Sequence, residues 1–175
     1  MTVLDYFVLI VVVASIASGA TRGILKGVIS LITVVVALIS AAFFYEPVAA
    51  VTAGFVETAR AANLVAFIGV FLLVVAGGAV VSRWLRGRLR RARLDWIDHT
   101  LGAVGGLVRG WLFCSVIYLA LTAFPVKIET VERAAFAPFL LEGTRVIAYL
   151  TSSEMRERFF EGYAMVKSIW DEEEK

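Results

Sequence analysis

The sequence predicts an all-α membrane protein with four transmembrane helices arranged as two helical hairpins, followed by a C-terminal amphipathic helical tail. Of its 175 residues, 60% are hydrophobic and 18% are charged, whereas soluble domains usually contain roughly 25% charged residues. The mean hydropathy is +0.85, and so apolar a chain cannot be covered with polar surface in water. Long charge-free stretches and a glycine motif that occurs twice favour the same fold class.

Four charge-free stretches define the expected spans. A helix needs about 20 apolar residues to cross the bilayer core, with a lower limit of about 17. The second and third stretches reach this length unaided, the first does so once Val3 and Leu4 are included, and the fourth does so once it begins near Leu101. The first is not expected to be a cleaved signal peptide, because residues 1–5 carry an acid and no lysine or arginine. The predicted membrane domain covers 1–126, with spans at about 3–21, 24–45, 61–82 and 101–124.

The pattern Gly-x-x-Arg-Gly occurs at 19–23 and again at 106–110. Glycines spaced four apart leave a groove along a helix, where a second backbone can approach closely. We read the repetition either as two parallel halves, in which the second helix of each hairpin carries the motif, or as chance similarity between glycine-rich spans. The glycines predicted to mediate helix packing are Gly19, Gly23, Gly27, Gly102, Gly106 and Gly110.

The distribution of arginines predicts the orientation in the membrane. A cluster of six arginines separates the third and fourth spans, whereas the loop after the second span carries Glu46, Glu57 and only Arg60. By the positive-inside rule the arginine loop is cytoplasmic, and four spans then place both termini on the external, periplasmic side of a bacterial inner membrane. Anionic lipid headgroups, rather than nucleic acid, are the expected partners of the cluster, at about 1 kcal/mol per residue. Its members are Arg83, Arg86, Arg88, Arg90, Arg91 and Arg93.

Four other charged residues are candidate interaction sites. Arg22 and Arg109 each precede a glycine beside an apolar run, where an arginine is costly in lipid unless it is paired. We predict that one of these two arginines pairs with Asp95 or Asp98, which are expected on the same side of the membrane. Asp5 lies near the external end of the first span and is either solvated at headgroup depth or functional. No second ionisable group follows it deeper in the span, so a proton relay has little support.

The sequence carries no pattern typical of a catalytic or metal site. Its one histidine, His99, and its one cysteine, Cys114, have no partners at ligand spacing. No nucleophile-elbow, zinc-protease or phosphate-loop pattern occurs. We therefore expect a protein that is not an enzyme and binds no cofactor or metal, with His99 at the membrane interface and Cys114 as a packing residue.

Residues 127–175 predict an external tail of amphipathic helices. Phe136, Leu140 and Ile147 recur near helical spacing, and 151–154 resembles a capping box that opens a second helix. These segments are too short and too charged to cross a membrane. The sequence leaves three placements open, since the tail can lie on the outer membrane surface, cover the bundle or bind a partner.

The order of these motifs resembles the colicin V production protein family, CvpA, over roughly residues 1–125. Asp5, the first glycine motif and the segment 94–110 carry the resemblance. Two positions depart from the family pattern, because Gly27 stands where members often have an acid and His99 where they often have arginine. The loss of that acid removes a charge pair with Lys26. The resemblance implies a bacterial inner-membrane protein required for production or export of a peptide toxin.

Helix association rather than catalysis is the expected mode of action, with a second copy of the chain or an envelope protein as partner. Two alternatives stay open. A small transporter or channel subunit would use the groove between the hairpins and predicts a polar path past Arg22 and Arg109. A membrane anchor or regulator would use the tail and predicts that Phe159 or Trp170 contacts a soluble partner.

Overall fold

The computed structural model describes residues 2–22, 24–52, 54, 56, 58–85, 95–125 and 134–173. These residues form helices and no strands, which confirms the all-α class. Among them, four helices are long and apolar enough to cross a membrane, as predicted. The long helices are α1 (Val3–Arg22), α2 (Ile24–Thr52), α3 (Ala59–Leu85) and α4 (Asp95–Ala123).

The helices extend beyond the charge-free stretches that located them. α2 continues past Glu46 and through Pro47 to Thr52, and α4 begins at Asp95 instead of near Leu101. At about 1.5 Å per residue, the 29 residues of α2 or α4 exceed the roughly 30 Å of a bilayer core. Hydropathy marks the part of a helix that can enter lipid, whereas the helix itself ends where its backbone hydrogen bonds end.

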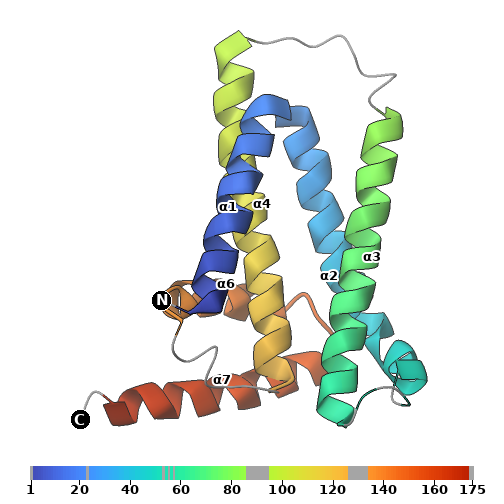
Figure 1. Ribbon diagram of the computed structural model, residues 1–175, viewed down its shortest axis with the longest axis vertical. Coiled ribbons are helices and arrows are strands. Elements are labelled where there is room, and N and C mark those ends of the chain that lie inside the picture. The colour runs from blue at the N-terminus through green and yellow to red at the C-terminus, as the bar shows by residue number, and fades with distance from the viewer. Residues whose placement is uncertain are drawn as a thin grey trace.

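One of the two tightest helix pairs joins helices that are not consecutive in the chain. α1 packs most closely on α4 and α2 on α3, whereas α1 touches α2, and α3 touches α4, only slightly. Contacts between α2 and α4 join the two pairs (Figure 1). The first glycine motif therefore lies at the end of α1 and the second within α4, on two antiparallel helices. This corrects the expectation that the second helix of each hairpin carries the motif, because α1 is the first helix of its hairpin. The two motifs lie on helices that pack closely on each other although they are far apart in the chain.

The two ends of the bundle differ (Figure 1). At one end, called the loop end, α1 and α3 finish while α2 and α4 begin. At the other, the tail end, lie the start of α1 and two further helices, α6 (Ala137–Ala148) and α7 (Ser153–Glu173). Aromatic side chains fill the core near the tail end, where Phe124 meets Tyr45 at a ring-centroid distance of 5.3 Å and Phe67 at 6.5 Å.

The tail covers part of the bundle. α6 and α7 both pack on α4, and Figure 1 shows α7 running across the tail end. Gly162 lies so close that an added Cβ would overlap the Thr122 carbonyl oxygen, and Gly143 sits against the Trp111 ring in the same way. Phe159 is fully buried, so it does not offer the partner contact considered for it. Phe139 and Val146 of α6 are exposed instead, as is Tyr149 directly after it. Cys114 is buried, as expected for a packing residue.

Candidate functional site

Glycines create a close contact between α1 and α4. A Cβ atom added at Gly19 of α1 would lie 2.9 Å from the Gly106 Cα atom of α4, and one at Gly110 would lie 2.9 Å from the Ser15 Cβ atom. Real Cβ contacts are essentially never below 3.0 Å. Added at Gly106, a Cβ would overlap the Ser15 carbonyl oxygen. α1 and α4 can therefore approach this closely only because side chains are missing on both helices.

The remaining predicted glycines differ in their surroundings. Gly102 lies against Gly19, whereas a Cβ added at Gly27 would meet no described atom within 4 Å. Gly23 lies outside the described residues. Sequence reasoning missed Gly78 of α3, where an added Cβ would lie 2.8 Å from the Thr33 hydroxyl oxygen of α2. The adjacent glycines Gly77 and Gly78 inside an apolar span were the available signal.

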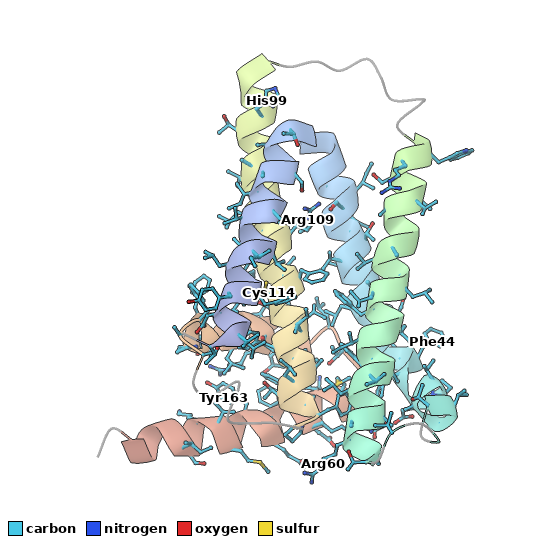
Figure 2. All side chains as sticks on the ribbon, in the orientation of Figure 1. Phe44, Arg60, His99, Arg109, Cys114 and Tyr163 are labelled. Atoms are coloured by element: carbon cyan, nitrogen blue, oxygen red, sulfur yellow. The ribbon has the colours of Figure 1, made fainter. Side chains whose placement is uncertain are left out.

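The close contact brings serine hydroxyls to Arg109. Its Nε and Nη2 donate hydrogen bonds to the Ser15 hydroxyl oxygen at 2.9 and 2.8 Å. Nη2 also donates to Ser18 at 2.7 Å, and Nη1 donates to Ser30 at 2.7 Å. Ser15 and Ser18 come from α1 and Ser30 from α2, so the guanidinium of α4 joins three helices (Figure 2).

Arg109 lines a cavity of about 680 Å³ among the four long helices. This volume lies within the 300–1,000 Å³ range that is typical of small-molecule sites. Arg83, which was expected to face lipid headgroups with the arginine cluster, also lines the cavity. None of the described residues in its wall is acidic. The polar side chains of the wall are Ser15, Ser18, Ser30, Thr33, Ser82, Arg83 and Arg109.

For Arg109, the predicted pair with Asp95 or Asp98 does not fit the fold. All three residues belong to α4, and Asp98 precedes Arg109 by eleven positions. At about 1.5 Å per residue this separation is about 16 Å along one helix axis, too far for direct pairing. Arg22 is the last residue of α1. Arg86, Arg88, Arg90, Arg91 and Arg93 lie outside the described residues.

Asp5 lies at the tail end, away from the cavity. Only 1% of its surface is exposed, so it is not the solvated carboxylate considered above. Its Oδ2 accepts hydrogen bonds from the Thr2 backbone N–H at 2.6 Å and the Thr2 hydroxyl at 3.2 Å. Its Oδ1 accepts one from the Phe136 backbone N–H at 3.2 Å. Asp5 thus links the start of α1 to the segment that leads into α6.

His99 and the three serines make polar contacts between helices. A ring nitrogen of His99 is in hydrogen-bond contact with the Ala20 carbonyl oxygen, which adds a polar contact between α4 and α1 at the loop end. Ser15, Ser18 and Ser30 were not expected to hold Arg109. The sequence held one signal for this contact, because all three are small polar residues in apolar helices and a buried arginine needs acceptors.

Comparisons with known proteins identify the family of this chain. The family model described as colicin V production protein matches residues 4–145. A curated relative, the colicin V production protein homolog of Haemophilus influenzae, is 31% identical over 121 residues, which cover 69% of this chain and 74% of the relative. No solved structure matches the chain. The chain is a multi-pass membrane protein that the family model matches over most of its length, and it belongs to the colicin V production protein family.

Proposed function

We propose that this protein acts in the bacterial inner membrane as a non-catalytic factor required for the production or export of a peptide toxin. The family match and the name of the Haemophilus influenzae relative support the toxin role. The six arginines that begin at Arg83 support a cytoplasmic loop end, which leaves the start of α1 and the tail outside.

The observation that carries the mode of action is the Arg109 site. A charged side chain inside a membrane bundle is costly and marks a functional position by default. Here the glycine contact between α1 and α4 brings Ser15 and Ser18 to the guanidinium, and Ser30 adds α2. Helix association thus positions the Arg109 side chain, and we propose that the protein acts through this positioned guanidinium.

Complementation of a deletion strain tests the proposal. Lysine keeps the charge of Arg109 but lacks the planar fork that reaches three hydroxyls at once. Arg109→Lys should insert and accumulate like the wild type and fail to restore toxin release. Arg145→Lys is the matched control, because Arg145 is exposed on α6 at the other end of the bundle. Full complementation by Arg109→Lys would leave Arg109 with a topological role only.

A second function, ligand binding or transport, is favoured by the cavity. Repeated helices around a polar site occur in transporters, and here four helices enclose a space with two arginines in its wall. An anchor or regulator would instead use the exposed apolar face of α6 at Phe139, Val146 and Tyr149. The cavity distinguishes the two, because substitutions in its wall should impair a transporter and leave an anchor intact.

A further inference from the structure

α6 packs against a part of α4 that belongs to its membrane span. The Thr144 hydroxyl of α6 contacts the Ser115 carbonyl oxygen of α4 at a hydrogen-bond distance of 3.1 Å, and Gly143 lies directly against the Trp111 ring. The apolar span of α4 covers His99–Ala123. Ser115 lies eight residues before the end of this span and Trp111 twelve, which is about 12 and 18 Å along the helix axis.

Both contact residues lie within the apolar core of a bilayer. The 25 residues of the α4 span extend about 37 Å, whereas a bilayer core is about 30 Å thick. Even with the whole excess of about 7 Å at the tail end, Ser115 and Trp111 stay inside the core. α6 therefore lies beside the span and not beyond its end.

The start of α1 gives a matching depth for the start of α6. The Phe136 backbone N–H, directly before α6, donates its hydrogen bond to the Asp5 carboxylate at 3.2 Å. The apolar span of α1 begins at Val3, so Asp5 lies just inside the tail-end border of that span. Figure 1 shows α6 at the level of the start of α1, with α7 farther out at the end of the bundle.

The charged side of α6 points toward α7. The guanidinium carbon of Arg145 lies 5.7 Å from the centroid of the Tyr163 ring of α7, and Arg145 also forms an ion pair with Glu142 at 3.4 Å. α7 carries acidic and basic residues along its length, among them the partly exposed pair of Glu154 and Arg158. So charged a helix is costly in hydrocarbon, and α7 therefore marks the polar side of α6.

A second exposed side of α6 is apolar. Phe139 and Val146 are 66% and 69% exposed, and they are seven residues apart, so they lie on one face of the helix. Consecutive residues point about 100° apart, so this face is turned away from Arg145. The Phe139 ring lies 6.1 Å from the Trp111 ring of α4, which places it beside the span. The apolar face thus meets neither α7 nor the interior of the bundle, but the layer that surrounds α4.

We propose that α6 is embedded in the lipid leaflet at the tail end of the bundle, where Phe139 and Val146 contact phospholipid acyl chains and Arg145 lies toward the headgroups. With 12 residues α6 is too short to cross, and a helix satisfies its own backbone hydrogen bonds in lipid. The proposal goes beyond the toxin role and does not depend on which end of the bundle faces the cytoplasm, because it concerns only depth in the membrane.

Electron paramagnetic resonance of spin-labelled cysteines tests the proposal, in the full-length Cys114→Ala protein in phosphatidylcholine vesicles. Oxygen concentrates in hydrocarbon and a neutral nickel chelate stays in water, so the two reagents distinguish lipid from water around a label. Phe139→Cys and Val146→Cys should match Val13→Cys, an exposed position within the α1 span, with high oxygen and low nickel accessibility. Ser168→Cys, exposed on α7, should show the reverse.

Arg145→Cys is the matched variant on the same helix. Its oxygen-to-nickel ratio should be several-fold lower than that of Val146→Cys, because the two side chains point in different directions. Phe139 and Val146 are both exposed, so labels there leave the contacts of the bundle intact. High nickel accessibility at both positions would place α6 in water and overturn the proposal. Low accessibility to both reagents would show that a second copy of the chain or another protein covers this face, which also overturns it.

Discussion

Ser15, Ser18 and Ser30 offer their hydroxyl oxygens as acceptors to the Arg109 guanidinium inside the bundle. Ser15 is the central one, since it accepts from both Nε and Nη2 and is almost fully buried. It can reach the guanidinium because Gly110, the residue after Arg109, leaves room for the Ser15 side chain. The arginine and its glycine neighbour thus act as one unit.

Ser15→Ala should therefore destabilise the protein by about 1–2 kcal/mol, since two guanidinium N–H groups lose a nearly buried acceptor. Unfolding in mixed detergent micelles measures the loss. Thr21→Ala is the control, because the Thr21 hydroxyl bonds only to backbone carbonyl groups of its own helix among the described residues. Equal stability of the two variants would show that Ser15 does not hold Arg109.

At the scale of helices, two contacts of α4 depend on glycine, one with α1 and one with the tail helix α7. α1 and α4 meet backbone to backbone around Gly19 and Gly106. α7 meets α4 in the same way at Gly162. Each contact joins elements that are far apart in the sequence, so a single added side chain should separate whole helices.

Gly106→Leu should separate α1 from α4 and lower stability by several kcal/mol, because a contact of about 1 kcal/mol is lost at each of several positions. Thermal unfolding in detergent is the measurement. Gly69→Leu of α3 is the matched control, since a Cβ at Gly69 would meet no described atom within 4 Å. A Gly106→Leu protein that unfolds at the wild-type temperature would rule out a packing role for Gly106.

An ion pair near the start of α7 predicts a pH dependence. A hydrogen bond from Arg158 at 2.7 Å holds the pKa of Glu154 below its ordinary value of 4.5. A lowered carboxyl pKa stabilises the folded state above pH 4.5, and this contribution is lost as the pH falls through the folded-state pKa. Both side chains are partly exposed, so the pair contributes only about 0.5 kcal/mol.

Amide hydrogen exchange in α7 should therefore speed up about twofold when the pH falls below the folded-state pKa of Glu154, after correction for the intrinsic effect of pH on exchange. Arg158→Gln should exchange at the faster rate at neutral pH and show a smaller further change with acid. Lys167→Gln, on the same helix, should behave as the wild type. A pH response of wild-type size in Arg158→Gln would assign it to another group.

At the scale of the molecule, the spans were predictable because hydropathy and charge depend only on local sequence. The pairing of α1 with α4 was not, since glycine spacing marks a helix that can be approached but does not name the helix that approaches. The partners of Arg109 were unpredictable for a related reason. Serines in apolar helices often bond to their own backbone, as Ser18 does to the Ser15 carbonyl oxygen. Only the assembled bundle places three of them around one guanidinium.

At the same scale, we propose that the loop end of the bundle faces the cytoplasm and that the tail covers the outer end. Single cysteines in a Cys114→Ala background test this claim, with an impermeant thiol reagent applied to cells whose inner membrane is intact. Thr100 lies at the loop end on α4, and Ser168 is exposed on α7. We predict that Ser168→Cys is labelled and that Thr100→Cys is labelled only after the membrane is opened. Labelling of Thr100→Cys with protection of Ser168→Cys would contradict the account.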